Sequence, residues 1–289
     1  MLLQEIVSTL DVHLLAIGRR RLGVNWNFEN VNSPYNRLIY VLEGEGRISH
    51  QGHTYRVGRG GLHLVPCYVT ADYASESERL ELCYLHFTSR AFGGLDVCRV
   101  QEYEYERPAR EVDRFFFHEL LRLNPGRELP VLDPAVRRYR IFHDETQKGY
   151  HGIDPRLHME NQAYVSLLLA PFLETGTARG TTKLESRRLY DFACYVEANL
   201  HRPFGLKDVS DALGITPNYL SDWLFKVLRI RPIEYINRRK IEEAQLLLIS
   251  SDVSIKEIAL RLGFTPSYFA RVFKRQLGVS ASRYREINR

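Results

Sequence analysis

Two stretches of this 289-residue chain repeat one another at a distance of 49 residues, and this repeat limits what the last third of the chain can fold into. The stretches are LGITPNYLSDWLFKVLRIRPIEYI, from residue 213, and LGFTPSYFARVFKRQLGVSASRYR, from residue 262. The coinciding residues include Gly214 with Gly263, Pro217 with Pro266, Tyr219 with Tyr268 and Tyr235 with Tyr284. This spacing predicts one small structural unit built twice.

The second copy carries the start and stop signals of two short helices. Ser254 is a good N-cap, and Glu257 three residues later completes a capping box. Gly263 supplies a left-handed turn, and a Thr-Pro pair begins the next helix. A short helix, a glycine turn and a second helix predict helix-turn-helix units at 206–228 and 255–277.

The second helix of each unit has a polar outer face, as a helix that enters the DNA major groove requires. The candidate base contacts are Asn218, Ser221, Asp222, Ser267 and Arg271. The candidate phosphate contacts are Lys226, Arg239, Lys274 and Arg275. Arg271 is the strongest base reader, because a guanidinium forks onto guanine O6 and N7. Asp222 repels phosphate, which predicts weaker DNA binding by the first unit. The aromatic residues of both units, Tyr219 among them, are expected in the core.

The segment between the copies, 232–250, has the pattern of one continuous helix. Such a helix is roughly 27 Å long. Successive major grooves on one face of DNA lie about 34–36 Å apart. The connector therefore predicts two groove helices about one duplex turn apart, so that one chain carries two half-site readers.

The positive charge of the chain gathers in this same part. Residues 180–289 hold 19 Lys and Arg against 12 Asp and Glu, a net of +7, whereas the whole chain is +5. A basic third on a slightly acidic body indicates a polyanionic partner, here double-stranded DNA.

At these residues the chain resembles the AraC/XylS family of bacterial transcription regulators. The matching motifs are Lys240-Ile241, Ala244, Leu247-Leu248, Ile258-Ala259, Gly263-Phe264, Tyr268-Phe269, Phe273-Lys274, Gly278, Ser280 and Tyr284-Arg285. Ala281 and Arg229 depart from the family pattern, which usually has Pro and Gly there. The resemblance implies a DNA-binding activator that works with RNA polymerase and responds to a small-molecule effector.

Residues 1–95 have the pattern of short strands separated by glycine turns, which predicts a small barrel or sandwich. The family resemblance implies a cupin-like, effector-binding barrel, with sugars among the effectors. In LELCYLHF, alternate side chains share a face, so Tyr84 and His86 point the same way. The candidate effector contacts are Arg37, Tyr40, Tyr73, Tyr84 and His86.

An alternative is a cupin-type metalloenzyme with an appended DNA-binding domain. Metal-binding cupins carry a His-x-His pattern, and the chain has none: His50 and His53 flank a turn, while His63 and His86 stand alone. We therefore expect no catalytic residue, no bound metal and no cofactor. A regulator whose barrel is only structural is a third interpretation.

The pattern turns helical from about residue 108, with further helical runs from Asp133 to Tyr150 and from Pro155, and residues 175–183 have the composition of a flexible linker. These middle helices resemble the dimerisation helices of the family. Their apolar face could pair two chains, which predicts a homodimer, or could cover the barrel of a monomer. The full prediction is an α+β chain with a cupin-like barrel at 1–95, a helical dimerisation or linker region at 96–178, and an all-α double helix-turn-helix domain at 179–289. Four scattered cysteines, a start unlike a signal peptide and no long apolar run favour a cytoplasmic protein without membrane contact.

Overall fold

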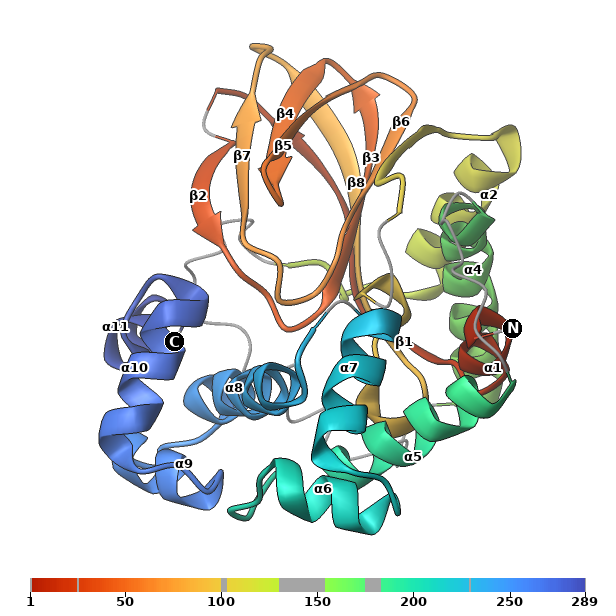
Figure 1. Cartoon of the computed structure of the whole chain (residues 1–289). Helices are drawn as coiled ribbons and strands as arrows, with labels where there is room; N and C mark the ends of the chain where they lie inside the picture. The colour runs from red at the N-terminus through yellow and green to blue at the C-terminus, as the bar shows by residue number, and fades with distance from the viewer. Residues whose placement is uncertain are drawn as a thin grey trace.

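The computed structural model of the chain combines a β-sheet part with an all-helical part (Figure 1). It describes residues 2–24, 26–99, 103–129, 154–174, 183–228 and 230–288. The helix predicted from residue 133 to 150, most of the linker predicted at 175–183, and Arg229 lie outside the described residues.

Two antiparallel sheets build the N-terminal part. The first has the order β1 (Asp11–Leu22), β8 (Leu80–Arg90), β3 (Asn36–Glu43), β6 (Gly61–Val65) and β9 (Glu106–Pro108). The second has the order β2 (Asn27–Val31), β7 (Ala71–Ser75), β4 (Glu45–His50) and β5 (His53–Gly58). The predicted glycine turns join these strands, with Gly44 and Gly52 at φ of 81° and 80°. The predicted barrel is thus confirmed as two antiparallel sheets that face each other.

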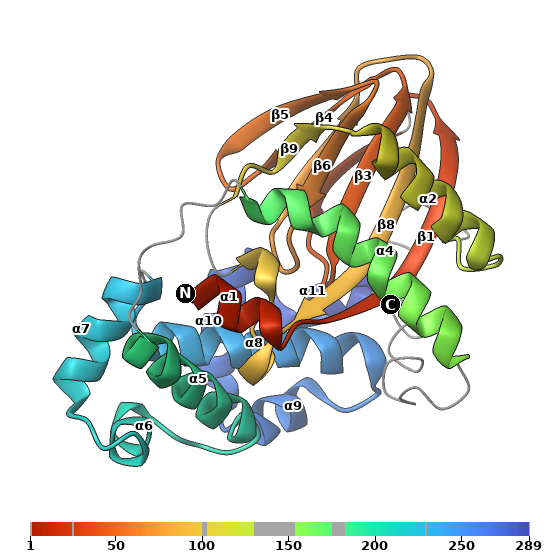
Figure 2. The same ribbon diagram turned by 90° about the vertical axis from the view of Figure 1, so that its right-hand side faces the viewer.

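Side chains of the five-stranded sheet alternate between two separate cores. One face, with Ile39 and Val41, lines the space between the sheets together with Ile48. The other face, with Leu38 and Tyr40, packs under helices. Those helices are α1 (Leu2–Ser8), α2 (Glu111–Leu123) and α4 (Pro155–Glu174), which lie across the outer face of the sheet in Figure 2. The middle helices therefore cover the barrel of their own chain.

The C-terminal part consists of short helices arranged around one long helix. The helices are α5 (Lys183–Ala198), α6 (Leu206–Ala212), α7 (Pro217–Leu228), the long α8 (Pro232–Ser250), α9 (Ile255–Arg261), α10 (Pro266–Leu277) and α11 (Ala281–Asn288). Two 3-10 turns, η1 (Phe92–Gly94) and η2 (Val97–Arg99), follow strand β8 at the end of the barrel. Two apolar cores form at the two ends of α8, one with α5, α6 and α7 and one with α9, α10 and α11. The continuous connector helix predicted at 232–250 is present as α8.

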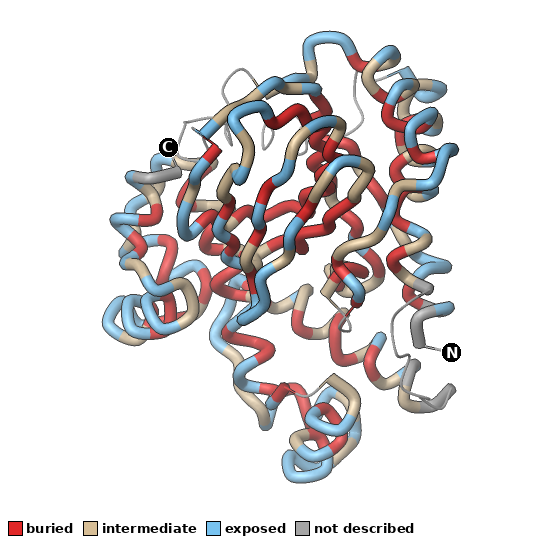
Figure 3. The backbone as a smooth tube through the Cα atoms, turned by 90° about the horizontal axis from the view of Figure 1, so that it is seen from above, coloured by how far each residue is buried: buried red, intermediate tan, exposed pale blue. Residues whose placement is uncertain are grey.

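The two parts of the chain pack directly against each other. A Cβ atom on Gly93 in η1 would lie 2.5 Å from the Cβ atom of Ala193 in α5, so glycine permits this close approach. The side-chain amide of Gln245 in α8 donates a hydrogen bond of 2.8 Å to Asn32 beside the barrel. Seen from above, buried residues concentrate in the strands and on the inner sides of the helices (Figure 3).

Candidate DNA-binding surface and barrel interior

The helix-turn-helix units form with the local signals that the sequence contains. The Ser254 hydroxyl accepts a hydrogen bond of 3.1 Å from the amide of Glu257, and Thr265 caps α10 through the amide of Tyr268. The Glu257 carboxylate pairs with Arg261 at 3.1 Å. The turn glycines have positive φ angles, 63° for Gly214 and 68° for Gly263. Each unit is therefore held by a cap and a left-handed glycine.

Helix α10 presents a basic face to solvent. Its inner side buries Phe269, Val272 and Phe273, and its outer side exposes Ser267, Arg271, Lys274 and Arg275. The Arg271 guanidinium lies 5.2 Å from the centre of the Tyr268 ring. Within the described part of the chain, no ion pair engages Arg271, Lys274 or Arg275. These cations are available to a polyanion without first giving up a carboxylate.

Helix α7 presents a face whose charges are already paired. Asn218 and Asp222 are exposed, and Ser221 is half-buried. Arg231, which precedes α8, donates hydrogen bonds of 3.0 Å to both Ser221 and Asp222. Lys226 pairs with Glu185 at 3.3 Å. Arg231 offsets the acid that sequence reasoning found unfavourable, but this face has less unpaired positive charge than α10.

Tyr219 does not belong to the core of the first unit, contrary to the prediction. Its side chain is 45% exposed, and its hydroxyl accepts a hydrogen bond of 2.5 Å from Arg188. The apolar side of α7 is formed by Leu220, Trp223 and Leu224. Tyr219 lies at the edge of this stripe, one turn before Trp223, and its ring packs against the Arg188 guanidinium at 5.2 Å.

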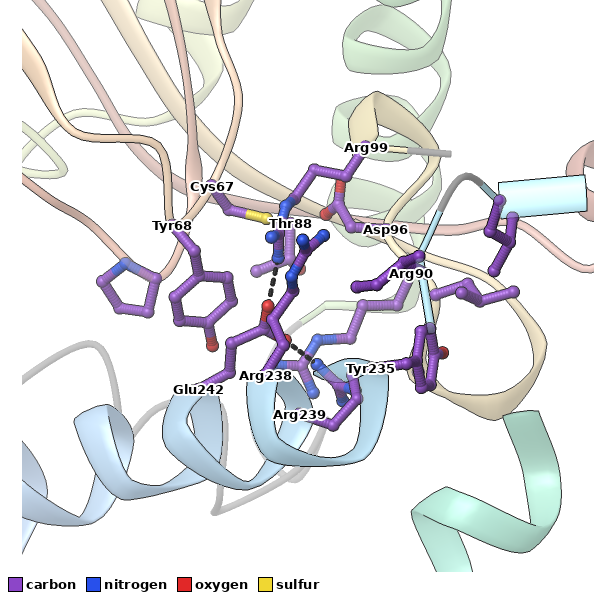
Figure 4. A pocket seen from close by; sticks show the side chains of 15 residues that line it. Cys67, Tyr68, Thr88, Arg90, Asp96, Arg99, Tyr235, Arg238, Arg239 and Glu242 are labelled. Carbon is purple, nitrogen blue, oxygen red and sulfur yellow. Dashed lines mark hydrogen bonds and ion pairs between the residues drawn. The ribbon is translucent and has the colours of Figure 1, made fainter. Parts of the chain in front are cut away.

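Arg239, predicted to contact phosphate, instead lies in an ion-pair network between the two parts of the chain. It pairs with Glu197 of α5 at 2.9 Å and with Glu242 one turn along α8. Glu242, which is 3% exposed, also pairs with Arg99 of η2. Figure 4 shows Arg99 and Arg239 on either side of the Glu242 carboxylate. This face of α8 points to the barrel, so Arg239 does not face solvent in this arrangement.

A pocket of about 80 Å³ lies beside this network, between the barrel and α8 (Figure 4). The barrel contributes Tyr68, Thr88 and Arg90, and α8 contributes Tyr235 and Arg238. Partial enclosure in the pocket wall, and then the charge of Arg99, lowers the pKa of Arg238, although its side chain is still 45% exposed. The wall of this pocket is therefore rich in cations and joins both parts of the chain.

The barrel interior brings together four of the five predicted effector contacts. Arg37 on β3 lies opposite His86 on β8, and its guanidinium lies 5.4 Å from the centre of the Tyr73 ring. The rings of Tyr84 and His86 lie 5.4 Å apart. Tyr40 is on the other face of β3, with its ring 5.4 Å from that of Phe117 in α2. Tyr40 therefore cannot contact a ligand that Arg37 binds, because residues an odd number apart on a strand face opposite sides.

A histidine pair that sequence reasoning did not anticipate lies in the same interior. The Nε2 atoms of His50 on β4 and His63 on β6 are 3.0 Å apart, beside Tyr55 and Tyr105. Burial is the main cause that lowers the pKa of His50 to about 4 and holds the pKa of His63 well below its usual value. In the described ranges, no three His, Cys, Asp or Glu side chains gather closely enough to hold a metal ion.

The described helices include none that is both long enough and apolar enough to cross a membrane.

Two family models match the chain: a helix-turn-helix domain at residues 209–287 and an AraC-like ligand binding domain at residues 24–111. The uncharacterized HTH-type transcriptional regulator YisR of Bacillus subtilis is 33% identical over 260 residues, which are 86% of this chain and 85% of YisR. The HTH-type transcriptional activator AarP of Providencia stuartii is 32% identical over 109 residues, 37% of this chain and 81% of AarP.

The fold is also that of a solved structure. The apo form of a ToxT variant from Vibrio cholerae superposes with a TM-score of 0.52 over 97% of both chains, at 14% identity, which confirms the α+β fold. The chain spans less than half of two further curated HTH-type regulators, covering 42% of one from Bacillus subtilis and 34% of one from Escherichia coli. The match to YisR extends over both parts of the chain, as do the two family models. This chain therefore belongs to the AraC/XylS family of transcription regulators, with an N-terminal AraC-like ligand binding domain and a C-terminal helix-turn-helix domain.

Proposed function

We propose that the chain is a sequence-specific activator of transcription that binds double-stranded DNA and responds to a small molecule held in its barrel. The observation that carries this proposal is the exposed cationic face of α10, where Arg271, Lys274 and Arg275 have no carboxylate partner within the described residues. A capped helix with such a face suits the major groove. Activation is supported by the family and by the name of AarP, and RNA polymerase would be the partner of a bound activator.

The two helix-turn-helix units would contribute unequally to DNA binding. Arg271 and Ser267 would read bases, while Lys274 and Arg275 would contact phosphates. Asn218, Ser221 and Asp222 would contact bases from α7, and Lys226 would reach phosphate after releasing Glu185. Arg239 would contact phosphate only if α8 left the barrel. The pairing of charges around α7 supports a weaker first unit.

We place the effector in the barrel, at Arg37, Tyr73, Tyr84 and His86, because the AraC-like ligand binding domain model covers these strands. Sugars are one class that the aromatic wall could hold. The proposed division of the chain is an effector domain at 1–95, a helical region at 96–178 and a DNA-binding domain at 179–289. YisR, a regulator matched over 85% of its length, supports a binding role rather than a catalytic one, and a regulator of bacterial promoters would act in the cytoplasm.

We propose a homodimer formed through the middle helices. The inner side of α4 packs on the barrel, but its outer side exposes an apolar row, Met159, Ala163, Leu167 and Ala170. Met159 is 68% exposed and Leu167 is 47% exposed. Phe115 of the neighbouring helix α2 is 54% exposed and extends this row. An exposed apolar surface of this kind is typical of a protein–protein contact.

The test of DNA reading uses the full chain and genomic fragments. Sequencing the fragments that the protein retains would define the operator, and neighbouring genes would suggest the effector. Arg271→Ala should weaken binding to that operator by about 1–3 kcal/mol and relax the preference at one base pair. Arg156→Ala is the matched control, because it removes the same charge from an exposed arginine of α4, outside the helix-turn-helix domain. Equal effects of the two substitutions would refute base reading by Arg271.

A further inference from the structure

Arg37 is a buried cation with little to neutralise it. Its side chain lies inside the barrel, and the residue is 4% exposed. Its Nη2 atom donates to the carbonyl of Val69 at 3.2 Å. Its Nε and Nη1 atoms are buried and have no hydrogen-bond partner among the described residues, and no carboxylate of these residues forms an ion pair with it. An arginine stays protonated even when buried, so this charge is permanent.

The three histidines that share the interior with Arg37 are neutral. His50, His63 and His86 line the same interior, and the Nδ1 atom of each is buried without a partner in the described part of the chain. Burial first, and the charge of Arg37 second, lowers the pKa of His86 to about 3. Near neutral pH these imidazoles can donate or accept hydrogen bonds but carry no charge. Arg37 is thus a cation without an ion pair among the described residues, and several hydrogen-bonding atoms in the same interior are unused.

Other largely buried arginines of this chain, unlike Arg37, have carboxylate partners. Arg107, whose side chain is 13% exposed, pairs with Asp113 at 2.8 Å. Arg239, whose side chain is 14% exposed, pairs with Glu197 and Glu242. A buried charge without a partner is costly, which explains these pairs. Arg37, which lies within the match to the AraC-like ligand binding domain, departs from this pattern.

We propose that the effector is a small organic acid whose carboxylate binds the Arg37 guanidinium inside the barrel. This rests on the proposed function, since it specifies the chemistry of the effector assigned to the barrel. A neutral sugar would supply hydrogen-bond acceptors but would leave the charge uncompensated. A carboxylate supplies hydrogen-bond acceptors and also the compensating negative charge, in the ion pair that arginine forms best. One fixed positive charge also matches a monoanion better than a phosphate monoester, which carries nearly two negative charges at neutral pH.

The body of the acid would lie against aromatic rings beside Arg37. The rings of Trp26 and Tyr73 lie 5.4 Å apart, and Tyr84 stands next to His86. Glycines make room for two of these rings: a Cβ atom on Gly46 would lie 2.6 Å from the Trp26 ring, and one on Gly18 would lie 2.4 Å from the Tyr84 hydroxyl. This wall favours an acid with a ring or a short apolar chain, and the neutral histidines favour one that also carries hydroxyl groups.

The binding test uses pairs of compounds that differ only in charge at one position. The probes are benzoate with benzamide, hexanoate with hexanamide, galacturonate with galactose, and glucose 6-phosphate as the phosphate arm. Calorimetric titration of the full-length protein should show that an acid binds. Its neutral counterpart should bind with an affinity lower by about 30-fold or more, as for a buried charge pair that loses one partner. The Arg37→Met variant should bind the acid with an affinity lower by the same factor. A neutral mate that binds as well as its acid, or glucose 6-phosphate as the tightest probe, would overturn the proposal.

A second measurement needs no knowledge of the effector. In dialysed protein, Arg37→Met removes an uncompensated buried charge and should raise the melting temperature. Arg107→Met is the matched control: it breaks a buried ion pair in the same part of the chain and should lower the melting temperature. A fall for Arg37→Met as large as that for Arg107→Met would contradict the proposal. Retention of operator DNA by the wild-type protein, measured in parallel, tests the regulator function separately.

Discussion

Glu242 should contribute more to stability than an exposed glutamate of the same kind, because its carboxylate lies between two guanidinium groups. The groups belong to Arg99 on the barrel side and Arg239 in α8. At close contact and an effective dielectric constant near 20, each attraction amounts to about 4 kcal/mol before the cost of burial is subtracted. Breaking such a buried pair costs about 3–5 kcal/mol. Glu242→Gln leaves the shape unchanged but leaves the two cations without their shared anion.

We expect Glu242→Gln to lower the free energy of unfolding by about 3 kcal/mol. For a protein of this size that corresponds to a fall in melting temperature of about 6 °C. Differential scanning calorimetry measures the shift, and hydrogen exchange should show the greatest loss of protection at η2 and α8. The matched control is Glu160→Gln, which removes a surface i,i+4 pair with Arg156 at 3.1 Å and should cost well under about 1 kcal/mol.

The pH dependence gives a further check on the same network. Burial alone would raise the pKa of Glu242, but the charges of Arg99 and Arg239 outweigh it and hold the pKa below its usual value of 4.5. A lowered pKa in the folded state stabilises the protein above the unfolded value and stops doing so as the pH falls through the folded value. The difference between wild type and Glu242→Gln should therefore be full near neutral pH and shrink in acid below 4.5. Equal melting temperatures for Glu242→Gln and Glu160→Gln near neutral pH would refute this reasoning.

Two further predictions concern the turns and the middle helices. Gly263→Ala should destabilise the chain more than Gly214→Ala: both glycines have positive φ, but only at Gly263 would a Cβ atom meet backbone, 2.5 Å from the nitrogen of Pro203. Chemical denaturation of the two variants compares them, and equal losses would contradict the role of the close approach. Leu167→Glu, on the outer side of α4, should convert the proposed dimer to a monomer in light scattering, whereas Leu260→Glu, the same change at an exposed leucine of α9, should not. A dimer that withstands Leu167→Glu would place the contact elsewhere.

Features written in short, local signals were predictable from the sequence. Ser254 and Thr265 cap their helices as expected, and Gly214 and Gly263 adopt the left-handed turns that their position after a helix predicts. Each signal depends on residues only a few positions apart. The unbroken α8 was predictable for the same reason, since its apolar period has no helix breaker after Pro232.

Tyr40 shows a prediction that a stricter reading of the sequence would have avoided. Arg37 and Tyr40 are three residues apart, and side chains of a strand alternate, so the two could not share a ligand. The structure has Arg37 facing the barrel interior and Tyr40 facing Phe117.

Contacts between distant segments could not be predicted in this way. Arg99 and Glu242 are 143 residues apart, and nothing near either residue indicates the other. His50 and His63 are close in sequence, but they belong to strands of different sheets, and their contact depends on how those sheets close. The face of α8 that carries Arg239 is polar and basic, which resembles a DNA-binding face until the barrel that covers it is known.

Strand β8 connects the proposed effector site to the contact with α8. Alternate residues of this strand share one face: Tyr84 and His86 line the barrel interior, while Thr88 and Arg90 line the pocket beside α8. A ligand on His86 therefore touches the same short, continuous strand that forms the pocket wall. It can change DNA binding only if it has different affinities for two arrangements of the barrel and α8. The Glu242 network holds one such arrangement together, and release of that network would free Arg239 to reach DNA.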